Sequence, residues 1–228
     1  MNRLVVLGAS NIARNFCNIA RIARSFNSGP LDMQLAFGHG RSYELRTTVL
    51  VRQLPGINHC GIWSNLETSP VESTYSLVTD IGNDILYGRS IQQIIESVRT
   101  SVVRLQAFSQ RIVITRPPMH AIRKLDSLRF VTMRSLLFPG CRLSLSQTVD
   151  LADDLDQQIL KLAAEQNLVV LEPLEHWFGL DPIHIQLWHS QAAWQSILNC
   201  VFAKDDAAAA AGRCQMAVTI TPSSRNFD

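Results

Sequence analysis

Short apolar runs alternate along the chain with longer segments in which apolar residues recur every three or four positions. The runs predict buried strands, because a strand covered on both faces is apolar throughout. The longer segments predict helices with one apolar face. The predicted strands are residues 4–7, 33–37, 75–79, 112–115 and 168–171, and the predicted helices are residues 12–26, 91–105, 150–166 and 185–202.

Strands that are separated by helices predict a parallel sheet covered on both faces, since parallel strands need long crossover connections. The pattern therefore predicts a single α/β domain over residues 1–203. Beyond it, residues 204–228 form a low-complexity and then polar segment, which predicts a poorly ordered tail. Residues 41–73 and 117–148 show no readable pattern and are expected to be loops that shape a site.

Composition narrows the class of protein. A chain of 228 residues with 46% hydrophobic and 18% charged residues suits one globular domain. The net charge of +2 and the scattered basic residues exclude nucleic acid and a charged membrane surface as expected partners. No stretch is long and apolar enough to predict a membrane span. The five cysteines have no metal-binding spacing, which predicts reduced thiols, no metal and a cytoplasmic protein. The first apolar run begins so early in the sequence that no leader is expected.

In the stretch "LVVLGASNIARN", an apolar strand ends at Gly8 and Ser10 follows two residues later. This pattern is typical of a dinucleotide site and of a nucleophilic serine. A dinucleotide site needs further glycines, where backbone must touch the pyrophosphate, but Asn11 and Ala13 stand at those places. The acidic residue expected after the second strand is also missing, so nucleotide binding is the weakest alternative. The other interpretation makes Ser10 a nucleophile.

A nucleophilic serine needs a histidine base, a carboxylate that orients the base, and donors for the oxyanion. His184 with Asp181 in "LDPIH" meets the first two needs after the fifth strand. The polar residues of these motifs also have a plain structural interpretation. Asp181 is typical of a helix N-cap followed by proline, Ser10 is equally suited to capping, and Asn83 in "DIGND" is typical of a polar turn.

Four blocks in order, "GASNIARN", "GHGRS", "DIGND" and "LDPIH", resemble the SGNH (GDSL-type) hydrolase family over residues 4–202. "GRS" and the first block bear a looser likeness to its carbohydrate acetylesterase branch. The resemblance implies a three-layer α/β/α flavodoxin-like fold with a five-stranded parallel sheet. It implies a triad of Ser10, His184 and Asp181, and an oxyanion hole formed by Ser10, Gly40 and Asn83, with Gly38 as the alternative glycine.

The first block departs from the family at Ala9, where an aspartate is usual. The resemblance implies a cytoplasmic esterase that uses no cofactor and forms an acyl-enzyme on Ser10. The expected substrate is a small acyl ester such as an acetate, with an acylated sugar as a further candidate. Arg116, at the end of the fourth strand, suggests an anionic substrate. The alternative from another class is a non-catalytic ligand-binding domain of the same fold, and the oligomeric state stays open.

Overall fold

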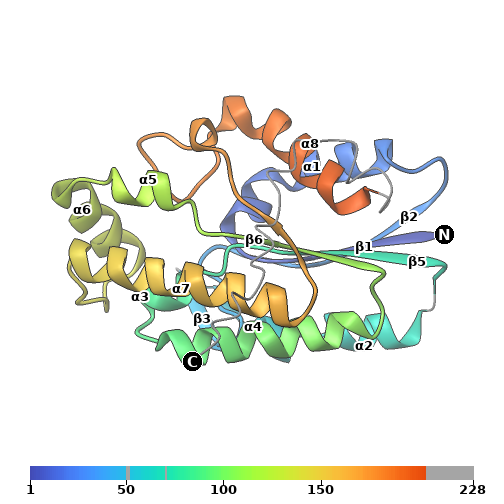
Figure 1. Ribbon diagram of the computed structural model, residues 1–228, viewed down its shortest axis with the longest axis horizontal. Helices are drawn as coiled ribbons and strands as arrows, with labels where there is room; N and C mark the ends of the chain where they lie inside the picture. The colour runs from blue at the N-terminus through green and yellow to red at the C-terminus, as the bar shows by residue number, and fades with distance from the viewer. Residues whose placement is uncertain (50–51, 70, 204–228) are drawn as a thin grey trace, which may run out of the picture.

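The predicted strands form one parallel sheet in the computed structural model, which describes residues 1–49, 52–69 and 71–203 (Figure 1). The predicted tail therefore lies outside the described residues. The strand order β2-β1-β5-β6-β7 confirms the flavodoxin-like arrangement, in which the first strand lies inside the sheet. The bounds are β1 (Asn2–Leu7), β2 (Leu31–Ala36), β5 (Ser73–Val78), β6 (Arg111–Thr115) and β7 (Val169–Leu171).

Helices cover both faces of this sheet, as expected for a parallel sheet (Figure 1). One layer holds α1 (Ser10–Ser25) and α8 (Leu187–Phe202). The other holds α2 (Ile62–Thr68), α4 (Ile91–Gln106) and α7 (Leu145–Glu165). The inner strand β1 is apolar without alternation because helices cover both of its faces. Val5 and Leu7 pack in the core with α4 and α7, whereas Leu4 and Val6 pack in the core with α1 and α8.

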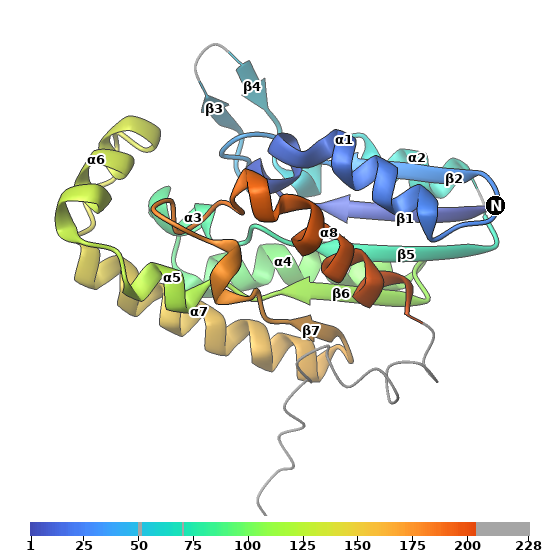
Figure 2. The ribbon, with the colours of Figure 1, turned by 90° about the horizontal axis from the view of Figure 1, so that it is seen from above.

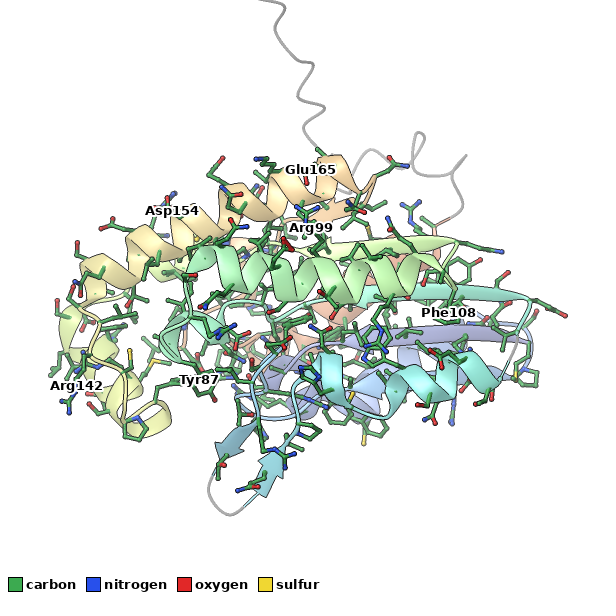
Figure 3. All side chains as sticks on the ribbon, turned by 90° about the horizontal axis from the view of Figure 1, so that it is seen from below. Tyr87, Arg99, Phe108, Arg142, Asp154 and Glu165 are labelled. Atoms are coloured by element: carbon green, nitrogen blue, oxygen red, sulfur yellow. The ribbon has the colours of Figure 1, made fainter. Side chains whose placement is uncertain are left out.

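The two longest helices of the second layer begin at capping boxes. Ser90 and Gln93 form a capping box before α4. A second box, Ser144 with Gln147, starts α7 five residues before the predicted beginning at residue 150. Figure 3 shows these helices from their outer side, where Arg99 of α4 and Glu165 of α7 form an ion pair of 2.8 Å.

Further elements lie mostly in the two regions without a readable pattern. A hairpin projects from the sheet edge near α1, and α6 stands apart from the sheet over one end of α7 (Figure 2). No helix within the described ranges has the length and apolar character that a membrane crossing requires. The additional elements are β3 (Thr47–Val49), β4 (Arg52–Leu54), α3 (Asn83–Leu86), α5 (Met119–Arg123), α6 (Ser127–Leu137) and 3-10 turns at Ile57–His59 and Glu175–Trp177.

Candidate active site

Ser10, His184 and Asp181 form a continuous hydrogen-bonded chain at the carboxyl ends of the strands. Nε2 of His184 lies 2.8 Å from Oγ of Ser10, and Nδ1 of His184 lies 2.6 Å from Oδ2 of Asp181. Ser10 begins α1 directly after β1, while the other two residues lie in the segment between β7 and α8. Residues 174 positions apart thus meet with the geometry that a serine nucleophile and its base require.

Helix capping, the plain interpretation of these motifs, does not describe either helix start. The N-cap of α1 is Ala9, and no side chain caps it. The N-cap of α8 is Gln186, five residues after Asp181, again without a side-chain cap. Asp181 instead accepts hydrogen bonds from the imidazole of His184 and, through Oδ1, from the backbone N–H of Ile183. The two motifs are therefore explained by their contact with each other.

The environment of Asp181 keeps its carboxylate ionised. Burial on its own raises the pKa of this carboxyl. The hydrogen bond from His184, the charges of His184 and Arg14, and the bond from Ile183 oppose burial and hold the pKa below its usual value. An ionised Asp181 fixes the proton of His184 on Nδ1 and leaves Nε2 free to accept a proton from Ser10.

Three hydrogen-bond donors that follow β1, β2 and β5 are free or weakly engaged. The backbone N–H groups of Ser10 and Gly40 donate no hydrogen bond within the described part of the chain. The side-chain amide of Asn83 lies 3.4 Å from the carbonyl oxygen of Arg41, the residue after Gly40. Ser10 is also the first residue of α1, where the helix dipole is positive and favours a developing negative charge.

A carboxylate that the sequence analysis did not assign to the site, Asp80, holds the turn that carries Ser10. Its Oδ2 accepts the backbone N–H groups of Ala9 and Asn11 at 2.9 and 3.1 Å, one on each side of the serine. Its Oδ1 accepts the side-chain amide of Asn11 at 2.8 Å. Burial raises the pKa of Asp80, and the hydrogen bonds from Asn11 and Ala9 oppose that rise. This turn therefore has a carboxylate partner although residue 9 is an alanine.

Asn11 connects the serine turn to the segment that carries His184. Besides its bond to Asp80, its amide donates to the carbonyl oxygen of Ile183 at 2.8 Å. Its Oδ1 accepts the backbone N–H of Ile185 at 2.9 Å. These bonds bracket His184 on both sides, so a single buried side chain sets the position of the base relative to the nucleophile. At the adjacent Gly8, a Cβ would lie 2.7 Å from the side chains of Ile12 and Thr79 and 3.1 Å from the carbonyl oxygen of Thr79, so a larger residue would force these neighbours to shift.

The segment that carries Gly40 is anchored by two buried side chains. Tyr43 donates its hydroxyl to the carbonyl oxygen of Thr79 at 2.8 Å and lies 3.2 Å from that of Leu7, at the ends of β5 and β1. Asp84, the last residue of "DIGND", accepts the backbone N–H of Tyr43 at 3.2 Å. Gly40 itself has a φ of +58°, a conformation that favours glycine.

The structure differs from one expectation about the walls of the site. Arg116 lines the adjacent cavity, but its guanidinium is bound to Asp156 at 2.5 Å and Glu172 at 2.8 Å, so it does not offer a free charge to an anionic substrate. Trp177 and Trp194 both line this cavity while being almost fully buried. Across the described residues, no cluster of histidine, cysteine or acidic side chains has a geometry that would hold a metal ion.

Solved structures with the same fold include esterases. A carbohydrate acetylesterase from Sinorhizobium meliloti is 13% identical, with a TM-score of 0.59 over 91% of this chain and 99% of that chain. An aryl esterase from M. smegmatis is 12% identical, with a TM-score of 0.58 over 87% and 96%. A member of the lipolytic G-D-S-L family from Veillonella parvula is 12% identical, with a TM-score of 0.53 over 87% and 97%.

The comparison of structures finds these relatives, whereas the two comparisons of sequences find none. No protein-family profile matches the sequence, and no curated protein sequence matches it. At sequence identities of 12–14%, structural similarity shows that two proteins share a fold but does not show that they share an activity. The resemblance to SGNH (GDSL-type) hydrolases is thus confirmed at the level of the fold, a three-layer α/β/α arrangement around a five-stranded parallel sheet.

Proposed function

We propose that this protein is a carboxylic ester hydrolase with Ser10 as its nucleophile. The observation that carries the proposal is the unbroken chain of short contacts from Ser10 through His184 to Asp181, at 2.8 and 2.6 Å. Ser10 is only 8% exposed, and the side chain of His184 is 12% exposed. Such a pair, largely withdrawn from water, favours proton transfer between its members over exchange with solvent.

The reaction follows from the positions of these groups. As Ser10 Oγ attacks the acyl carbon, Nε2 of His184 takes its proton, and Asp181 stabilises the resulting imidazolium through Nδ1. The protonated histidine then donates to the leaving alcohol oxygen, which leaves the acyl group on Ser10. A water molecule, deprotonated by His184, releases the carboxylic acid and restores the serine. The chemistry needs no metal or cofactor.

The oxyanion formed during each attack is assigned to three donors, namely the backbone N–H groups of Ser10 and Gly40 and the amide of Asn83. The absence of other hydrogen bonds to the first two within the described residues supports this assignment. The contact of Asn83 with the carbonyl of Arg41 is long, at 3.4 Å, and so is readily exchanged for a charged oxygen. Such donors supply a large part of the rate enhancement in acyl transfer.

Reaction with a fluorophosphonate tests the proposal directly, since this probe forms a covalent bond only with an activated serine. We expect a single adduct, located by peptide mass spectrometry on Ser10, together with turnover of p-nitrophenyl esters. Heat-denatured protein is the control, because it retains every serine but no longer holds His184 near Ser10. A native protein that gives neither an adduct on Ser10 nor ester turnover contradicts the proposal and favours a non-catalytic binding domain.

The role of Asp80 gives a second test. Asp80→Asn replaces one acceptor oxygen with a donor that faces an N–H group. The turn that positions Ser10 therefore loses a hydrogen bond to residue 80. We expect kcat to fall by up to roughly 100-fold with little change in KM, because the attacking atom is displaced while substrate contacts remain. The rate of fluorophosphonate labelling should fall in parallel.

The matched control is Asp154→Asn, which makes the same chemical change on the exposed side of α7 (Figure 3). It should leave kcat, KM and the melting temperature at wild-type values. Melting curves of both variants identify any loss caused by unfolding. An Asp80→Asn protein that is folded and retains full kcat would show that Asp80 has no part in positioning the serine.

A further inference from the structure

A cavity of about 160 Å³ lies beside Ser10 at the carboxyl edge of the sheet. It extends from the serine past the ends of β6 and β7 and is bounded by α3, α5, α6 and α7. In Figure 2 these helices surround the end of the sheet toward which the arrows of β1 and β6 point. The cavity therefore lies next to the reacting atoms of the proposed esterase, where part of the substrate can occupy it.

The wall of this cavity is apolar. Its side chains include Ile85 and Leu86 of α3, Ile122 of α5, and Phe130 and Met133 of α6. The two arginines in the wall are engaged within the protein. Arg116 pairs with two carboxylates, and Arg134 donates to the carbonyl oxygen of Leu143 at 2.6 Å and lies against the ring of Phe130. The wall thus favours hydrocarbon over a charged or hydroxylated group.

The position of the catalytic groups indicates which half of an ester enters the cavity. Ser10 and Asn83 line it, as do Ile183 and Ile185 on either side of His184, whereas His184 itself is not among its described lining residues. The leaving alcohol must lie against His184, which donates a proton to it. The acyl carbon must lie against Ser10. The chain attached to that carbon is consequently the part that faces the cavity.

Resting on the proposed function, we infer that this cavity binds the acyl chain of the substrate, and that the preferred acyl group is a hydrocarbon chain of about six carbons or an aromatic ring. An apolar cavity of roughly 150 Å³ is known to hold benzene, which sets the scale. An acetyl group would leave most of the space unfilled. This preference is larger and more apolar than the acetyl group implied by the sequence resemblance.

The chain-length dependence of p-nitrophenyl ester hydrolysis measures this preference. Each methylene that enters an apolar site contributes about a threefold to fourfold gain in kcat/KM, so the hexanoate should exceed the acetate by roughly 100-fold. The dodecanoate should show no further gain, because the cavity has no room for the additional carbons. A flat series, or one that is highest at the acetate, overturns the inference and leaves the proposed function intact.

Filling the cavity provides a matched pair of variants. Ala152 and Ala163 are both buried on α7, but only Ala152 lines the cavity. Ala152→Leu should lower kcat/KM for the hexanoate at least tenfold while changing that for the acetate less than threefold. Ala163→Leu introduces the same overpacking elsewhere in the core, so it should leave the hexanoate-to-acetate ratio unchanged. Melting temperatures of both variants report any general destabilisation.

Binding without turnover separates the inference from the proposed function. In the Ser10→Ala protein, ethyl hexanoate should change the fluorescence of Trp177 and Trp194 saturably, since both side chains line the cavity. Ethyl acetate should not, and an added Ala152→Leu change should weaken hexanoate binding at least tenfold. Failure of ethyl hexanoate to bind, or binding that is insensitive to Ala152→Leu, overturns the inference. Binding in a protein whose native form hydrolyses no ester overturns the proposed function alone.

Discussion

Replacing Ser10 with alanine is expected to lower kcat for ester hydrolysis by roughly 10⁶-fold, the scale found when a triad serine is removed. The substitution removes the hydroxyl oxygen that lies 2.8 Å from Nε2 of His184 and that would carry the acyl group. The donors around the oxyanion would remain, so a small residual rate above that in water is expected. Fluorophosphonate labelling should disappear altogether, because it requires the covalent bond.

Ser25→Ala supplies the control for this variant. Ser25 is the last residue of α1, and its hydroxyl bonds the carbonyl oxygen of Ile22. Its replacement should leave turnover and labelling unchanged. Labelling that persists in the Ser10→Ala protein, or turnover within tenfold of the wild type, would contradict the assignment of Ser10 as the nucleophile.

Asp181→Asn is expected to lower kcat by roughly 10⁴-fold while the melting temperature changes little, as the equivalent change does in other serine triads. The amide nitrogen of asparagine donates a hydrogen bond to Nδ1 of His184, which moves the imidazole proton to Nε2. In that tautomer Nε2 faces Ser10 as a donor and has no lone pair for the serine proton. Steady-state kinetics with a saturating ester measures the effect.

The comparison with Arg14 separates charge from geometry at this carboxylate. Nη1 of Arg14 lies 3.4 Å from Oδ2 of Asp181 at an exposed position. Exposed pairs of this kind contribute little, so Arg14→Gln should change kcat less than tenfold. An Asp181→Asn protein that is folded and keeps more than a tenth of wild-type kcat would refute the orienting role of the carboxylate.

The strands could be predicted from the sequence because each is an apolar run ended by a glycine, proline or polar residue. The shorter elements could not. Helix α6 presents apolar residues on more than one side, since Phe130 is buried while Leu128 is 78% exposed, so no helical face is visible in its sequence. Strands β3 and β4 have only three residues each, too few to establish an alternating pattern.

The residues of the candidate triad were predictable because parallel strands deliver their carboxyl ends to one edge of the sheet. Asp80 stands at that edge too, directly after β5, and its position could have drawn attention to it. Its partners could not be read from the sequence. The bonds of Asp80 reach Ala9 and Asn11 about 70 positions away, and those of Asn11 reach the segment around residue 184. Such pairing follows from the folded topology and not from any local pattern.

The hydrogen bonds of Asn11 to Ile183 and Ile185, on either side of His184, have a consequence for the order of events during synthesis. The serine turn leaves the ribosome before its base, which lies 174 positions later in the sequence. Contacts so distant in sequence form late, because a long loop must close first. Under the proposed function, a nascent chain that has completed most of the sheet therefore still lacks an activated serine, and labelling is expected only when the segment that carries His184 docks. The time course of fluorophosphonate labelling during refolding would follow that last step.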